Sequence, residues 1–191
     1  MICQGDTMVK QDSRDAIRKT VLSALFIAVG LVLPFFTAQI PQIGNLLLPM
    51  HIPVLLCGFV CGWQYGISVG AVLPLLRSLM FSMPQLYPNA LAMSAELATY
   101  GFVCGIMYNK MLRKQNILTI YISLVSAMLA GRIVWGIAEA ALLGIGVFTP
   151  EMFVAGAFIN AVPGIILQLV FIPALLEALN RAGVIPFRTN N

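Results

Sequence analysis

The lysines and arginines of this chain are confined to short segments separated by long apolar runs. Nine of the eleven form three clusters: Lys10, Arg14, Arg18 and Lys19; Lys110, Arg113 and Lys114; and Arg181 and Arg188. Membrane proteins with several spans carry such basic clusters in their cytoplasmic loops. Hydrophobic residues make up 60% of the 191 residues and charged residues 9%, against about a quarter charged in soluble domains. We therefore expect the chain to fold in a bilayer, with its net charge of +4 in those loops rather than on a nucleic-acid surface.

The apolar runs predict an all-α integral membrane bundle of six transmembrane helices with both termini in the cytoplasm. In chain order the spans are expected at residues 16–36, 49–62, 63–83, 89–112, 117–145 and 153–179. This arrangement places every clustered basic residue on the cytoplasmic side. The bundle is thus one six-helix transmembrane domain over 16–181, preceded by a partly helical cytoplasmic lead-in (1–15) and followed by a cytoplasmic tail (182–191). The second span, about a dozen residues long, is shorter than the roughly 20 residues that a crossing needs.

Several polar residues interrupt the predicted spans at a similar depth. They are Arg77, Glu96, Arg132 and Glu139, together with the amide Asn160. Asn89, at the outer start of the fourth span, is a further candidate binding residue. A helix rises about 1.5 Å per residue, so all of them fall in the outer half of the membrane. Charges at such positions mark binding sites, or they pair with one another to become neutral. The sequence leaves both interpretations open and favours a cavity that faces outward.

Three of these positions form one stripe on the fifth span. Arg132, Trp135 and Glu139 follow the spacing i, i+3, i+7, which places them on one helix face. A cation, an aromatic ring and an anion on one face suit a small polar ligand with a planar or apolar part. The guanidinium fork of arginine favours a carboxylate or phosphate on that ligand. His51, which opens the second span, is interpreted as a helix-start residue rather than a ligand contact.

Enzymatic and metal-binding alternatives find little support. Gly66-Ile-Ser-Val-Gly70 matches the G-x-S-x-G pattern of hydrolases, but His51, the single histidine, lies at the opposite membrane face. Small residues that let helices approach closely are the better interpretation of this motif. Cys57 and Cys61 share a helix face without a nearby histidine or third thiol, so neither a metal site nor a disulfide is expected. The chain has no phosphate-binding loop of the G-x-x-x-x-G-K-[ST] type, so we expect no nucleotide cofactor and no catalytic residues.

A further motif connects these features to a known family. Ala24-Leu-Phe-Ile-Ala28 in the first span is a small-x-x-x-small pair that permits close helix approach. With six spans, a short second span and a polar first outer loop, the whole chain resembles the substrate-binding S component of an energy-coupling factor (ECF) vitamin transporter. The segments 48–58, 74–77 and 96–101 are similar to the branch that includes the riboflavin, folate and pantothenate binders.

The resemblance implies a multi-pass protein of a bacterial cell membrane that is not an enzyme. It would capture a vitamin from outside and associate with a transmembrane coupling subunit and two ATPase subunits. Ala24 and Ala28 would face the coupling subunit, and a first loop containing Gln42 and Asn45 would cap the ligand. The implied ligand contacts from the last three spans are Glu96, Arg132, Trp135, Glu139 and Asn160.

The two arginines of the expected cavity favour pantothenate as the vitamin, with riboflavin next. One subgroup of the family binds nickel or cobalt through an amino-terminal Met-His, whereas this sequence starts Met1-Ile2, so a metal substrate is not expected. The alternative function is that of a stand-alone secondary transporter of a small organic solute. Such a transporter would be expected to show internal repeats or broken midplane helices, which the sequence does not reveal.

Overall fold

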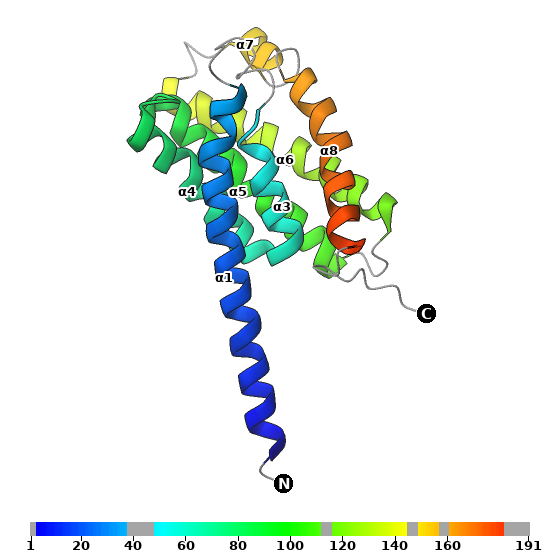
Figure 1. Ribbon diagram of the computed structural model, residues 1–191. Coiled ribbons are helices and arrows are strands. Elements are labelled where there is room, and N and C mark those ends of the chain that lie inside the picture. The colour runs from blue at the N-terminus through cyan, green and yellow to red at the C-terminus, as the bar shows by residue number, and fades with distance from the viewer. Residues whose placement is uncertain (1–2, 38–47, 112–115, 145–148, 157–160, 182–191) are drawn as a thin grey trace.

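The computed structural model describes residues 3–37, 48–111, 116–144, 149–156 and 161–181, and over these ranges it is helical without strands (Figure 1). The elements in chain order are α1 (Cys3–Thr37), α3 (His51–Cys61), α4 (Trp63–Phe81), η1 (Leu86–Ala90), α5 (Leu91–Ile106), η2 (Met107–Met111), α6 (Ile117–Leu143), α7 (Pro150–Val154) and α8 (Val162–Arg181). The amino-terminal half of α1 extends beyond the other helices, and α7 lies at the opposite end of the bundle (Figure 1).

The helices are those of a protein that crosses a membrane several times. Within the described ranges, four segments are long and apolar enough for a span: Ser13–Phe35, Leu86–Asn109, Ile117–Leu143 and Val162–Arg181. The apolar helix α3 has 11 residues, fewer than the roughly 20 that cross a bilayer. Helix α4 has 19 residues, includes Arg77 and Pro74, and is not one of the four. These four segments agree with four of the six predicted spans. The other two spans and the cytoplasmic position of the termini stay predictions.

Most of the predicted helix boundaries agree with the structure, and one differs. The lead-in was expected to be partly helical, and from Cys3 onward it is continuous with the first span in α1. The sixth span was expected to start at Phe153, but Phe153 belongs to the short helix α7. The Thr149 hydroxyl accepts a hydrogen bond from the Met152 N–H at 3.4 Å, which caps α7. The long helix α8 starts only at Val162, with Pro163 in its first turn, where a missing N–H is tolerated.

Helix α5 lies at the centre of the packing. It contacts α3, α4 and α6, while α1 packs on α3 and α4, and α8 packs on α3 and α6. One apolar cluster joins α3, α5, α6 and α8 around Tyr100, Leu124 and Ile172. A second cluster joins α1, α3, α4 and α5 around Val54 and Leu73. These clusters fix the helices that carry the polar residues described below.

Glycines bring the backbones of α4 and α5 into contact. A Cβ atom on Gly66 would lie 2.7 Å from the carbonyl oxygen of Gly101, and one on Gly70 would overlap the backbone of Leu97. The Ser68 hydroxyl between them is exposed and donates a hydrogen bond to the carbonyl oxygen of Gln64 at 3.0 Å. The G-x-S-x-G sequence is therefore a helix-packing motif, as expected for small residues in a membrane helix.

Candidate functional site

A cavity of about 670 Å³ opens among the helices of the bundle. Its walls come from the ends of α1 and α4, the start of α3, the start of α5 and the second half of α6. The lining residues are Pro34, Leu48, Pro49, Met50, His51, Arg77, Met83, Pro84, Gln85, Asn89, Met93, Glu96, Arg132, Trp135, Glu139 and Gly156. The walls thus combine apolar side chains with both signs of charge.

The cavity brings together most of the residues that the sequence singled out. Six of the predicted ligand contacts line it: Arg77, Asn89, Glu96, Arg132, Trp135 and Glu139. Gln42, Asn45 and Asn160 lie outside the described residues. The predicted stripe on α6 faces the cavity with all three of its members. That these side chains contact a ligand stays a prediction.

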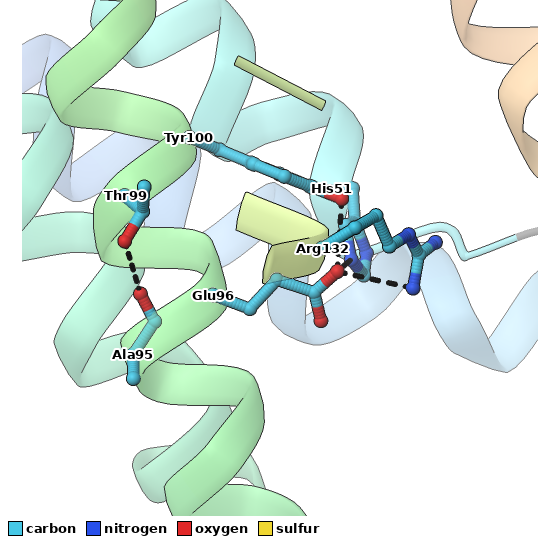
Figure 2. Close-up of polar contacts among 6 residues, drawn as sticks. All are labelled: His51, Ala95, Glu96, Thr99, Tyr100 and Arg132. Atoms are coloured by element: carbon cyan, nitrogen blue, oxygen red, sulfur yellow. Dashed lines mark hydrogen bonds and ion pairs between the residues drawn. The ribbon is translucent and has the colours of Figure 1, made fainter. Parts of the chain in front are cut away.

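Glu96 is the centre of a buried polar network (Figure 2). The Tyr100 hydroxyl, one turn further along α5, donates a hydrogen bond to Glu96 Oε1 at 2.8 Å. Arg132 on α6 places Nη1 3.1 Å from the same oxygen. The carboxylate therefore neutralises Arg132 and fixes its position. For Glu96 and Arg132, the interpretation that charged residues pair with one another to become neutral therefore applies.

His51 also belongs to this network, although the sequence did not predict this role for it. It is the first residue of α3, as predicted, but its ring is 1% exposed and lines the cavity. Its Nε2 atom lies 3.6 Å from Glu96 Oε1. Among the described residues, neither ring nitrogen has a hydrogen-bond partner, and the same is true of Arg132 Nε. A buried polar group without a partner costs about 1–3 kcal/mol, so these nitrogens are candidates for binding a ligand.

The position of His51 in the sequence contained a signal for this role. It stands at the outer start of its span, in the same half of the membrane as the charged residues of the other spans. The interpretation as a helix-start residue considered only its own helix. The contact with Glu96 requires knowing that α3 and α5 are neighbours.

Arg77 is held in a different way from Arg132. Its Nε donates a hydrogen bond to the Met83 carbonyl oxygen at 3.1 Å, and its Nη1 donates one to the Leu31 carbonyl oxygen at 3.5 Å. The guanidinium carbon lies 5.8 Å from the centre of the Phe35 ring, within cation–π range. Across the described ranges, no carboxylate forms an ion pair with Arg77. The side chain connects α4 to α1, and no carboxylate among the described residues neutralises its charge.

Glu139 and Trp135 form the remaining polar part of the cavity wall. Glu139 is 5% exposed, and no ion pair or side-chain hydrogen bond joins it to another residue in the part of the chain that the structure describes. The Trp135 ring stacks on Phe153 of α7 with centroids 6.3 Å apart and planes inclined by 23°. The aromatic ring thus has a fixed orientation beside an acidic group.

A second surface of interest lies on α1, away from the cavity. Ala24 and Ala28, the predicted docking residues, are both exposed. Exposed large apolar side chains continue along the same helix: Ile17, Val21, Leu25, Val29, Val32 and Phe35. The small-x-x-x-small pair therefore does not pack inside the described part of the bundle. It is available to lipid or to another protein.

Comparisons with known proteins give one match. The model of the family described as "ECF transporter, substrate-specific component" matches residues 18–186. No curated protein and no solved structure matches the chain. The family match covers α3 to α8 and nearly all of the membrane part of α1.

Proposed function

Because the chain belongs to the family of substrate-specific components of ECF transporters, we propose that it captures a vitamin or related small organic molecule outside the cell for ATP-driven uptake. Members of this family are substrate-binding subunits and not enzymes. Under this proposal a transmembrane coupling subunit and two ATPase subunits supply the energy. The absence of a phosphate-binding loop from the sequence is consistent with that division of labour.

The observation that carries the proposal is the charged cavity in an otherwise apolar bundle. Arg77, Glu96, Arg132 and Glu139 come from three different helices and line one space. Its volume of about 670 Å³ falls within the roughly 300–1,000 Å³ that is typical of small-molecule sites. Charged groups inside a membrane are costly and are retained mainly where a substrate passes or binds.

The lining residues suggest the chemistry of the substrate. Arginine side chains recognise carboxylates and phosphates, and Arg132 Nε, which has no hydrogen-bond partner among the described residues, adds a further donor. Trp135 offers an apolar surface to the remainder of the molecule. We therefore propose a substrate with an anionic group, and pantothenate is the first vitamin to test. Riboflavin, which has no anionic group, is the next candidate on the basis of the family resemblance alone. Gln42, Asn45 and Asn160 are proposed as additional contacts on the basis of the family resemblance.

Two measurements on the purified protein test this function. Mass spectrometry of the small molecule carried by the protein as isolated should identify a compound with a carboxylate or phosphate. Affinity purification from its native host should recover ATPase subunits. ATP-independent, gradient-driven uptake by the chain alone in proteoliposomes would contradict the proposal and favour a secondary transporter.

Capture from outside also requires a defined orientation, which cysteine labelling can measure. Single cysteines at Gln42, Gln85 and Thr149, in a chain without its native cysteines, should react with a membrane-impermeant reagent applied to intact cells. A cysteine at Arg113 should react only after the cells are opened. Labelling of position 113 in intact cells would reverse the proposed orientation, because the positive-inside rule is its main support.

A further inference from the structure

The arginines and glutamates that line the cavity are equal in number, but only one arginine and one glutamate among them form an ion pair. Two arginines, Arg77 and Arg132, and two glutamates, Glu96 and Glu139, line it. Arg132 and Glu96 neutralise each other at 3.1 Å. One cation, Arg77, and one anion, Glu139, remain. Both are nearly enclosed, with exposed fractions of 8% and 5%.

Neither of these two charges has a counter-ion in the described part of the chain. Arg77 donates its hydrogen bonds to backbone carbonyl oxygens. Glu139 forms no ion pair with any described lysine, arginine or histidine. The segments 38–47, 145–148 and 157–160 contain no basic residue that could supply one. An ionised carboxylate enclosed in a membrane protein is unfavourable unless a cation approaches it.

The two charges come from different helices. Arg77 belongs to α4 and Glu139 to α6, and each of these helices packs on α5. A ligand within the cavity therefore meets a positive group from α4 and a negative group from α6. A molecule with a net negative charge would satisfy Arg77 but would be repelled by Glu139.

From this charge arrangement we infer that the substrate is a zwitterion. Its carboxylate or phosphate group lies toward Arg77, and its protonated amine lies toward Glu139. This inference rests on the proposed function and narrows it: among anionic solutes of the right size, those that also carry an ammonium group bind more tightly. Pantothenate, which has no amine, binds less tightly than an aminocarboxylate of similar length.

Simple probes can test the class of substrate without knowing its identity. A series of ω-amino acids with two to eight carbons between the charged groups is added to the purified protein in detergent, and the shift in Tm is measured. The matched probes are hexanoate, which lacks the amine, and hexylamine, which lacks the carboxylate. At least one ω-amino acid should raise Tm more than either matched probe at the same concentration. A series that never exceeds hexanoate would overturn the inference.

Two substitutions should change the preference in opposite directions. Glu139→Gln should weaken binding of the best ω-amino acid by more than tenfold and strengthen binding of hexanoate. Arg77→Gln should weaken the same ω-amino acid and strengthen binding of hexylamine. Glu151→Gln, an exposed carboxylate of α7, is the control and should change neither. Equal losses for all probes in the two cavity variants would indicate a structural role and refute the assignment.

The stability of the protein without added probe gives an independent reading. Glu139→Gln removes an uncompensated charge and should keep or raise Tm, whereas Glu96→Gln breaks the pair with Arg132 and should lower it. A fall in Tm for Glu139→Gln that matches Glu96→Gln would mean that Glu139 has a structural counter-ion. Failure of these probe tests would leave the association with ATPase subunits intact, so the inference and the proposed function can fail separately.

Discussion

Helices α4 and α5 meet in two different ways along their length. At one end Gly66 faces Gly101 and Gly70 faces Leu97, with backbone against backbone. Toward the end of α4, Arg77 lines a cavity of about 670 Å³ together with Glu96, which directly precedes Leu97 in α5. The difference shows how one helix pair can serve two purposes. The glycines allow the two backbones to pack directly against each other, whereas long charged side chains line the cavity.

The two regions also differ in what stabilises them. The glycine contacts depend on dispersion between closely packed atoms, which is the main attraction available between helices in lipid. The cavity region contains enclosed nitrogen atoms that have no hydrogen-bond partner among the described residues, such as His51 Nδ1 and Arg132 Nε. Such groups lower stability, and they are retained where a ligand uses them. The predictions below test this division, beginning with the largest expected effect.

The first prediction concerns the glycine region. Gly70→Leu should prevent correct folding, because even a Cβ atom at this position overlaps the backbone of Leu97 and cannot be accommodated by a rotamer change. The expected loss exceeds about 3 kcal/mol, the upper end of ordinary overpacking. The yield of monodisperse protein in detergent and its Tm are the measurements.

Ser68→Ala is the matched control for this change. It lies two residues away on the exposed side of α4, and its hydroxyl donates a hydrogen bond to the Gln64 carbonyl oxygen of its own helix. It should leave yield and Tm unchanged. A well-folded Gly70→Leu protein would show that α4 and α5 are not in backbone contact, and the comparison between the two regions would fail.

The second prediction concerns the buried pair in the cavity. Arg132→Met should lower stability by about 3–5 kcal/mol, because it leaves Glu96 enclosed without its cation. Adding Glu96→Gln should recover most of this loss, while Tyr100 can still donate its hydrogen bond to the amide oxygen. Chemical or thermal unfolding of the two variants measures both effects. Absence of recovery in the double variant would mean that Arg132 is stabilised by another group.

Much of the glycine region could be predicted from the sequence, because its signal is local. Gly66 and Gly70 lie one turn apart, and that spacing alone suggested close helix packing. The start of α3 at His51 and its end before Gly62, which has a φ of 97°, likewise follow from local residues. The short helix α7 was missed because the Thr149-Pro150 start signal lies inside an otherwise apolar stretch.

The cavity could be predicted in outline but not in its pairing. Depth along the spans indicated that Arg77, Glu96, Arg132 and Glu139 would converge. Nothing in the sequence specified that Arg132 would pair with Glu96 while Arg77 would bind the carbonyl oxygens of α1 and the segment after α4. Those choices depend on which helices are neighbours and on how each one is rotated.

The third prediction distinguishes the two arginines. Arg77→Met should weaken binding of the compound that the protein carries by more than tenfold, equivalent to about 1.4 kcal/mol. Unlike Arg132→Met, it leaves no enclosed carboxylate without a partner, so its effect on stability should be smaller. Arg77→Lys should recover part of the affinity, since an ammonium group keeps the charge but not the fork. Isothermal titration with that compound measures the change, and unaltered affinity in Arg77→Met would remove this arginine from the site.

The last prediction concerns the outer face of α1, where we expect the smallest effect on the chain itself. Ala24→Trp and Ala28→Trp enlarge exposed positions that are remote from the cavity residues. Tm and ligand affinity should therefore stay close to those of the unaltered protein. Uptake should nevertheless be lost, because a bulky ring prevents the close helix approach that the proposed coupling subunit requires.

A matched substitution separates a specific docking surface from a general effect of bulk. Val170→Trp places the same ring on an exposed position of α8, where the native side chain is 67% exposed, and it should leave uptake intact. If Val170→Trp abolished uptake as well, bulk anywhere on the membrane surface would be the cause. If Ala24→Trp instead reduced affinity together with uptake, α1 and the cavity would be energetically coupled. The separation between a ligand-binding region and a partner-binding face would then no longer hold.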